Sequence, residues 1–241
     1  MQVPDCRRPL VVQPHYDDND LGCAGTLRRI AVSGGHLTYV TVTDDVAGVL
    51  DAELSDTQAR ELVAEEQERA GRIIGVGRQI RLDWPDAGGL PHVELRDQLI
   101  DIIRDVRPDL VLTVDPQLPD ESHADHLSTA AAVAEAVLLS GLPRIRSGTD
   151  GEPFSCPWIA YYFTAAPTTY VDTSPFQVER HGALDCYQAQ FDAGDLAALH
   201  RALDHRERRQ ARRLGDASAT HAEALRVVPQ RQLHVGLPPL D

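Results

Sequence analysis

Short apolar runs alternate with longer helical patterns up to about residue 140, and this alternation constrains the fold most. The apolar runs indicate buried strands, and the apolar residues spaced by three or four between them indicate helices. Strands separated by helices form a mostly parallel sheet covered on both faces, so we expect a Rossmann-like α/β fold, a three-layer sandwich. The expected strands are 10–13, 37–43, 79–82 and 110–114, and the expected helices are about 21–33, 57–74, 92–106 and 126–140.

The pattern changes beyond Gly141, where we expect a C-terminal extension of strands and helices. The proline-containing segment 143–157 favours a loop. After it, the expected elements are strands at 158–164 and 169–172 and helices at about 175–190 and 194–214. We therefore expect a single domain over 1–241, with a core at about 8–140 and an extension at about 141–241.

The net charge of the chain argues against two classes of partner. The chain has 37 acidic and 23 basic residues, a formal net charge of −14, and it contains no lysine. An acidic surface without a basic stripe argues against nucleic acid and anionic membranes as partners. The arginine-rich segment 206–213 is interpreted as a solvated helix face. The glutamates of helix 57–74 are also expected on a solvated face: Glu61, Glu65, Glu66 and Glu68.

The chain has no apolar stretch near the roughly 20 residues that span a bilayer, so we expect no membrane span. Its first residues include arginines but neither the apolar core nor the small-residue cleavage site of a signal peptide. We therefore expect a soluble cytoplasmic protein.

Two clusters of acidic residues and histidines each follow a predicted strand. His15, Asp17, Asp18 and Asp20 come after the first strand, and the segment 115–126 follows the fourth. In a doubly wound sheet of order 3-2-1-4, the first and fourth strands are neighbours, and their carboxyl ends flank the crevice where such folds bind ligands. The two clusters are therefore expected to meet in space.

The combined clusters predict a catalytic metal site. Two imidazoles and one carboxylate, from His15, Asp18 and His126, leave an open coordination position, which is typical of catalytic zinc; Fe²⁺ or Co²⁺ fits the same donors. Such an ion activates water at neutral pH, and the adjacent Asp17 is placed to accept its proton. His123 is predicted to stabilise an oxyanion or protonate a leaving amine. Asp125 is predicted to orient His123.

The motif PHYDDNDLGCAGTL at 14–27 resembles the signature of the PIG-L (LmbE-like) zinc-dependent N-acetylglucosaminyl de-N-acetylases, and SHADH at 122–126 resembles their second motif. Other segments resemble the family more weakly, and they occur in the same order as in the family along nearly the whole chain. The resemblance implies a metal-dependent hydrolase that removes an N-acetyl group from a small amino-sugar conjugate. It implies zinc on His15, Asp18 and His126, Asp17 as general base, and His123 as general acid with Asp125 as its partner. The family often forms rings or trimers, so a homo-oligomer is also implied.

Several positions concern the substrate rather than the metal. The resemblance implies that Asp86, in the segment 84–90, contacts the sugar, and that His221 lines the pocket near the chain end. Tyr16 replaces the proline of the first motif, and its side chain is expected either to line the pocket mouth or to pack between helix and loop. Val46 and Val63 stand where family members commonly have a glutamate and an arginine. Arg60, one helical turn before Val63, is a candidate to replace that arginine.

Two alternatives stay open. The altered substrate residues Val46 and Val63 permit an inactive protein of the same fold that keeps its metal and binds a ligand. An acidic metal site for a nucleotide sugar, as in a glycosyltransferase, is a third interpretation. Two histidine ligands favour zinc over magnesium, which prefers oxygen, and so favour the hydrolase.

Overall fold

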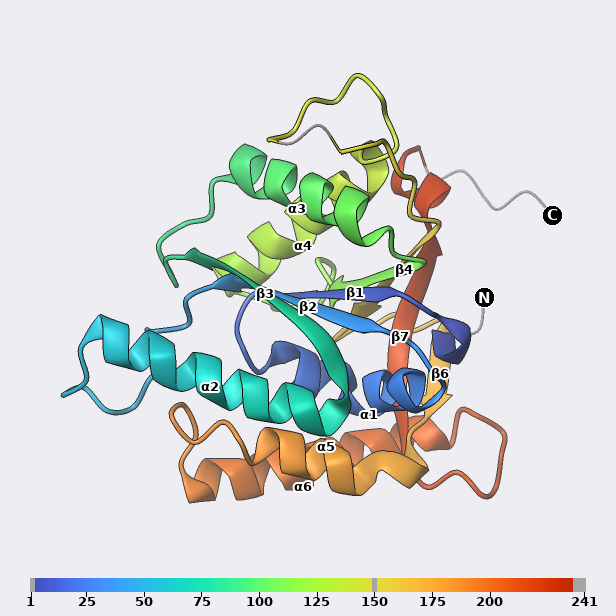
Figure 1. Ribbon diagram of the computed structural model, residues 1–241. Helices are drawn as coiled ribbons and strands as arrows, with labels where there is room; N and C mark the ends of the chain where they lie inside the picture. Colours follow the sequence, from blue (N-terminus) through green and yellow to red (C-terminus); the bar gives the residue numbers. More distant parts are fainter. Residues whose placement is uncertain (1–2, 149–150, 236–241) are drawn as a thin grey trace.

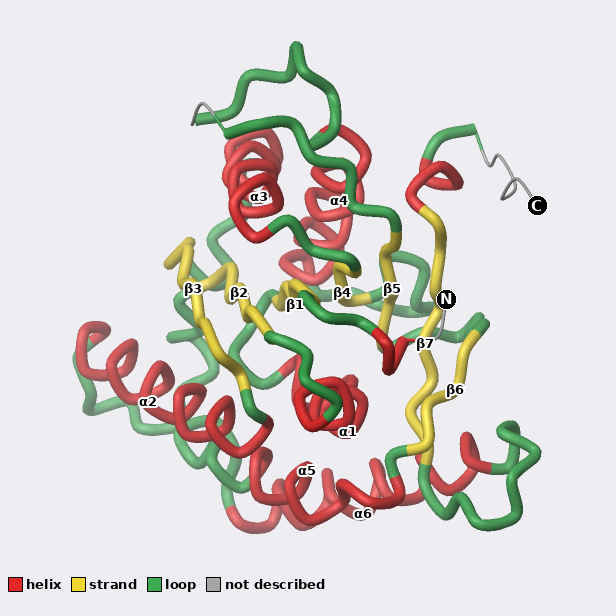
Figure 2. The backbone as a smooth tube through the Cα atoms, turned by 45° about the vertical axis from the view of Figure 1, so that its right-hand side comes forward, coloured by secondary structure: helices red, strands yellow, loops and turns green. Residues whose placement is uncertain are grey.

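A seven-stranded sheet forms the centre of the computed structural model, which describes residues 3–148 and 151–235. The strand order is β3-β2-β1-β4-β5-β7-β6, which confirms the order expected for the first four strands (Figure 2). The neighbours from β3 to β5 pair in parallel, whereas β7 runs antiparallel to β5 and β6. The strands are β1 (Pro9–Gln13), β2 (Leu37–Thr43), β3 (Val76–Trp84), β4 (Leu110–Val114), β5 (Trp158–Tyr162), β6 (Thr169–Asp172) and β7 (Ala222–Pro229).

Helices cover both faces of the sheet, as expected for three layers (Figure 1). α3 and α4 pack together over one face, and α1, α2, α5 and α6 lie over the other. The pleat of β1 serves both layers, because Leu10 and Val12 join the core under α3 and α4 whereas Val11 joins the core around α1. The helices are α1 (Asp18–Val32), α2 (Asp56–Ile74), α3 (His92–Val106), α4 (Ala124–Leu139), α5 (Gln177–Leu184) and α6 (Ala193–Ala211).

Most predicted elements are confirmed, and the strands 37–43, 110–114 and 169–172 and the helix 92–106 match to the residue. β7 was not predicted, because its charged Glu223 and Arg226 hide the apolar pattern of a buried strand. Both charges are satisfied inside the fold, Arg226 by Asp115 and Glu223 by backbone N–H groups. The predicted loop 143–157 contains residues 149 and 150, which lie outside the described residues. No helix in the described ranges has the length and apolarity needed to cross a membrane.

The prediction that Glu66 lies on a solvated face is wrong. Its side chain is buried under the segment that follows α5, and its carboxylate accepts the backbone N–H groups of Gln188 and Ala189 at 3.1–3.2 Å. The N–H groups of Gln188 and Ala189 bind Glu66 instead of helix carbonyl groups, because α5 ends at Leu184. The predicted helix 175–190 therefore stops six residues early. Burial raises the pKa of Glu66 above its ordinary value.

α1 follows β1 closely and is broken in its second turn. Cys23 has φ −155° and ψ 24°, outside the helical region. After the break, the N–H groups of Gly25 and Thr26 donate to the carboxylate of Glu223 on β7, at 2.8 and 2.7 Å. A Cβ at Gly22 would lie 2.2 Å from the ring of Tyr162, so only glycine lets the helix approach β5 here. The first turn of α1 is thereby held at the edge of the sheet.

Candidate metal centre and active site

An open cavity of about 450 Å³ lies at the carboxyl edge of the sheet. His15, Asp17 and Asp18 line it from the first cluster, and His123 and His126 line it from the second. β1 and β4 are hydrogen-bonded neighbours, with Leu10 opposite Val111, which explains why clusters a hundred residues apart meet. The expected convergence of the two clusters is therefore observed.

Three side chains form a set that could hold one metal ion. His126 Nε2 lies 3.4 Å from Asp18 Oδ1, and His15 Nδ1 lies 3.4 Å from Asp18 Oδ2. One donor atom from each residue lies within 4.8 Å of the others, and the two imidazole centroids are 5.3 Å apart. The structure thus brings together the three residues predicted as ligands. Two nitrogens and one carboxylate oxygen are a donor set that suits zinc.

The two aspartates at the start of α1 have different surroundings. Asp18 Oδ2 accepts the backbone N–H of His15 at 3.0 Å, which fixes its carboxylate beside that histidine. Asp17 is the N-cap residue of α1, but its side chain makes no capping hydrogen bond. Helix capping therefore does not explain why an aspartate stands at position 17, which lines the cavity. Burial, together with the neighbouring charge of Asp18, raises the pKa of Asp17 well above its ordinary value.

Asp20, the fourth ionisable residue of the first cluster, does not join the site. Its carboxylate points into the core and accepts the hydroxyl protons of Tyr39 and Tyr187. Asp17 and Asp20 are three residues apart at the start of α1. The hydrogen bonds from the two tyrosines hold the Asp20 carboxylate away from the cavity. Its charge is therefore satisfied by the core and not by a bound cation.

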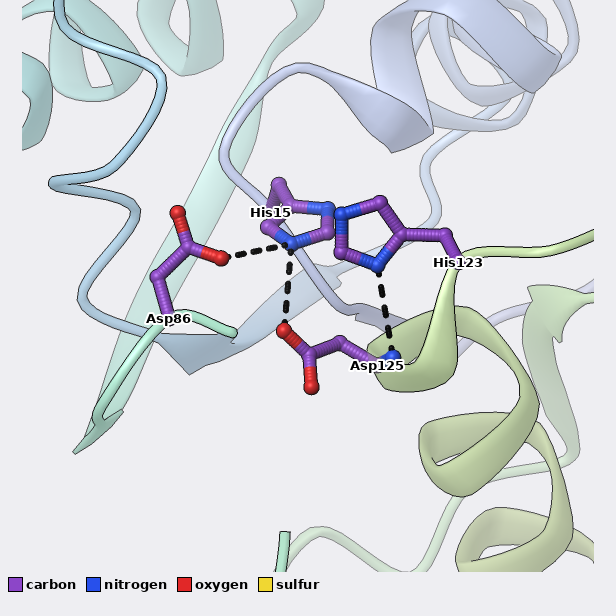
Figure 3. Close-up of side chains that lie close together, drawn as sticks. All are labelled: His15, Asp86, His123 and Asp125. Atoms are coloured by element: carbon purple, nitrogen blue, oxygen red, sulfur yellow. Dashed lines mark hydrogen bonds and ion pairs between the residues drawn. The ribbon is translucent and has the colours of Figure 1, made fainter. Parts of the chain in front are cut away.

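The second cluster runs into the start of α4. His123 is the N-cap of α4 and is exposed, and its Nδ1 accepts the backbone N–H of Asp125 at 3.3 Å. The Asp125 carboxylate instead faces His15 and the loop after β3: its Oδ2 accepts the N–H of Ala87 at 2.9 Å and lies 3.7 Å from His15 Nε2 (Figure 3). The contact between Asp125 and His123 thus comes from the Asp125 backbone, whereas its carboxylate takes a donor from another loop. A role of this carboxylate in orienting His123 stays a prediction.

Asp86 lines the cavity, as the sequence led us to expect. Its Oδ1 lies 3.4 Å from His15 Nε2, and its Oδ2 accepts the N–H of Ala47 at 3.1 Å. The neighbouring His15 imidazole lowers the pKa of Asp86, which keeps the side chain ionised.

The other three predicted substrate residues are not among those that line the cavity. Arg60 binds Asp44 Oδ2 with two nitrogens, at 2.9 and 2.7 Å, while Asp44 Oδ1 accepts the N–H of Asp86. Tyr16 packs in the core around α1. His221 pairs with Asp204 of α6 at 2.8 Å, because the start of β7 lies against that helix. Arg60 therefore braces the Asp86 loop from outside.

Glu121 is a site residue that sequence reasoning missed, although it lies within the second cluster. Its Oε2 is 3.0 Å from His126 Nδ1, and its Oε1 accepts the backbone N–H of His123 at 2.8 Å. One carboxylate thus holds both histidines. With Nδ1 engaged, His126 presents Nε2 to Asp18 and the cavity. Its spacing of five residues before His126 was the available signal.

Asp45 was also missed. It lines the cavity in a left-handed conformation, with φ 54°, and its Oδ2 accepts the N–H of Tyr16 at 3.0 Å. Burial raises the pKa of Asp45 to about 7. Among residues other than glycine, aspartate and asparagine adopt this conformation most readily. The pair Asp44-Asp45 directly after a predicted strand was therefore the available sequence signal for this residue.

The cavity strongly favours positive charge. The residues that line it within the described chain include four carboxylates, from Asp17, Asp18, Asp45 and Asp86, and no arginine. Burial opposes protonation of His15, but the neighbouring carboxylates of Asp18 and Asp86 outweigh it and raise the pKa of this histidine to about 11. A bound divalent cation would satisfy the same carboxylates, so the residues present fit a metal ion.

Comparison with known proteins agrees with this site. Residues 10–137 match the family model described as PIG-L, GlcNAc-PI de-N-acetylase. The diacetylchitobiose deacetylase of Thermococcus kodakarensis is 33% identical over 193 residues, which cover 78% of this chain and 71% of that protein. The 1D-myo-inositol 2-acetamido-2-deoxy-alpha-D-glucopyranoside deacetylase of Mycobacterium leprae is 31% identical over 189 residues, 66% of this chain but only 61% of that enzyme's length.

The fold is similar to that of a solved enzyme over nearly its whole length. The structure of N,N'-diacetylchitobiose deacetylase from Pyrococcus horikoshii superposes with a TM-score of 0.89 at 29% identity, covering 96% of this chain and 87% of that one. The residues matched by the family model include both motifs at the cavity. The chain belongs to the PIG-L family of zinc-dependent de-N-acetylases.

Proposed function

We propose that the chain hydrolyses the N-acetyl group of a small amino-sugar conjugate, with Zn²⁺ bound by His15, Asp18 and His126. The observation that carries this proposal is a second pair of functional groups beside that set. Asp17 lines the same cavity, and the ring of His123 lies 4.5 Å from that of His15 and 5.1 Å from that of His126, centroid to centroid. A metal-ion site, a carboxylate and an exposed imidazole in one cavity are the groups that amide hydrolysis needs.

The donor set supports zinc as the metal. Two imidazole nitrogens and one carboxylate suit Zn²⁺ better than Mg²⁺, and Fe²⁺ or Co²⁺ accepts the same donors. When bound, the ion polarises the amide carbonyl and activates water. Glu121 keeps His126 in the orientation that this binding requires.

The remaining groups divide the proton transfers between them. Asp17 accepts the proton of the attacking water, because it lines the cavity and its side chain makes no capping hydrogen bond. His123, exposed at the N-terminus of α4, donates a proton to the departing amine nitrogen. Asp125 faces His15 Nε2 at 3.7 Å, and its hydrogen bond from Ala87 ties α4 to the loop that carries Asp86. Asp86 faces the cavity, where it can accept a hydrogen bond from a sugar hydroxyl.

The charge of the cavity selects among amino sugars. Its wall combines four carboxylates with Gln190 and Phe191 and, in the described chain, no arginine. No arginine of the described wall is available to pair with a phosphate group, so a phosphorylated sugar or a nucleotide sugar is disfavoured. Both relatives above are named for an acetylated amino sugar, diacetylchitobiose in one case. We therefore expect a neutral or amine-bearing N-acetyl amino sugar as substrate.

Acetate release from three acetamides tests the proposal: N,N'-diacetylchitobiose, an N-acetylglucosaminyl inositol, and N-acetylglucosamine 1-phosphate as the anionic comparison. We expect turnover of the neutral sugars and at least about tenfold slower turnover of the phosphate. Zinc bound without hydrolysis of any amide would instead indicate an inactive binding protein. Binding of a nucleotide sugar together with Mg²⁺ would indicate a glycosyltransferase.

A further inference from the structure

We propose that a second divalent cation binds on the other side of the His15 ring, held by His15, Asp86, His123 and Asp125. One donor atom from each of these four residues lies within 4.8 Å of the other three. Figure 3 shows the four side chains converging from the loop before α1, the loop after β3 and the start of α4. Two imidazoles and two carboxylates are a complete tetrahedral donor set for zinc.

An unsatisfied buried atom supports this site independently. His15 Nε2 has no hydrogen-bond partner within the described chain, although the residue is only 8% exposed. It faces Asp86 Oδ1 at 3.4 Å and Asp125 Oδ2 at 3.7 Å, each beyond good hydrogen-bond distance. A cation held between them would satisfy both the buried ring nitrogen and the two carboxylates. The second set uses Nε2, whereas Nδ1 of the same ring faces Asp18 and the first set.

The shared ring makes the second site the weaker one. When both nitrogens of His15 bind cations, the ring must lose its N–H proton to solvent. The free energy of this deprotonation lowers the affinity for the second ion. His123 is exposed, whereas His15 and Asp18 are buried and His126 is partly buried, so the second set contains the ligand most open to water. We therefore expect the second cation to bind only when zinc exceeds the protein.

The second cation would inhibit the proposed reaction, and this consequence rests on the proposed function. It would take the His123 lone pair and the Asp86 carboxylate, which the proposed function assigns to proton transfer and sugar contact. Cation binding itself does not depend on any reaction. The two statements are therefore measured separately.

Zinc binding to the metal-free protein, followed by isothermal titration and by metal analysis after equilibrium dialysis, tests the site. We expect two equivalents in the wild type, with the second at least about tenfold weaker, and one equivalent in Asp86→Asn. The asparagine keeps the shape of Asp86 and an oxygen that can accept the N–H of Ala47. His123→Ala, at an exposed position, is a second variant that should bind one equivalent.

Asp105→Asn is the matched control, because this acid is exposed and pairs with Arg78 away from the cavity. It should bind two equivalents. One equivalent in the wild type, or two in both Asp86→Asn and His123→Ala, would overturn the proposal. Acetate release at one and at ten equivalents of zinc then measures inhibition. A wild type without activity at either ratio would contradict the proposed function, whereas the number of zinc ions bound would still decide whether the second site exists.

Discussion

Two walls of the cavity are built in different ways. The sheet wall (His15, Asp17, Asp18 and His126) lies where β1 leads into α1 and where β4 leads, through the loop 115–123, into α4. The loop wall (Asp45, Ala47, Asp86 and Ala87) follows β2 and β3 and depends on contacts between loops. Asp86 accepts the N–H of Ala47, and Ala87 donates to Asp125 of α4. Local spacing sets the first wall, whereas long-range backbone contacts set the second.

This difference separates metal binding from substrate recognition. The sheet wall can hold its ligands with few partners, such as the bond from His15 N–H to Asp18. The loop wall includes Asp45 and Ala87 with positive φ, at 54° and 53°, and such conformations persist only where surrounding contacts hold them. We infer that substitutions in the sheet wall change catalysis or metal binding, and that those behind the loop wall change substrate affinity.

The largest expected effect comes from Asp17→Asn in the sheet wall. An amide cannot accept the proton of the attacking water, so kcat should fall by about 10²–10⁴-fold. Asp17 is not one of the candidate ligands, so the zinc content should stay at the wild-type value. Steady-state kinetics and metal analysis of the same preparation check both points. Wild-type kcat in this variant would remove Asp17 from the mechanism.

Asp20 sharpens the comparison, because it lies in the same sequence cluster but serves the core. Burial raises its pKa to about 6, above the 3.8 of an unfolded aspartate. The folded chain therefore holds this proton more tightly, and the contribution to stability is present below pH 4 and is lost as the pH rises through 6. Relative to Asp20→Asn, the wild type should lose up to about 3 kcal/mol between pH 4 and pH 7. Urea unfolding of both metal-free proteins tests this, and parallel pH profiles would refute it.

Glu121 tests whether the sheet wall needs support from outside the ligand set. Glu121→Ala frees the ring of His126 and should weaken zinc binding by about 10–100-fold. Glu121→Gln keeps an acceptor for one histidine and should lose less. Competition with a zinc-binding dye gives both affinities. Equal, wild-type affinities would show that His126 needs no carboxylate partner.

The smallest expected effect is at Arg60, behind the loop wall. Its side chain is half exposed and acts on Asp86 only through Asp44. Arg60→Gln should therefore raise KM by no more than about fivefold and leave kcat unchanged. Arg78→Gln, which breaks a surface pair with Asp105, is the control and should change neither constant. A fall in kcat at constant KM would place Arg60 closer to the chemistry than the structure does.

Sequence reasoning predicted the four residues of the sheet wall but only Asp86 of the loop wall. The strand order and the motif spacing predict that His15, Asp18 and His126 meet, because both depend on local pattern and on one rule of sheet topology. The direction of the Asp125 carboxylate could not be predicted, since its partner Ala87 lies 38 residues away. The contacts of Tyr16 and His221 could not be predicted for a similar reason: burial in a core or against α6 depends on neighbours that no motif records.

A crystal structure of the protein with one equivalent of zinc, with anomalous data at the zinc edge, tests the central claim most directly. We predict a single strong peak within bonding distance of His15 Nδ1, Asp18 and His126 Nε2. A peak elsewhere, with these three side chains unchanged and no metal between them, would contradict the assignment of the metal centre.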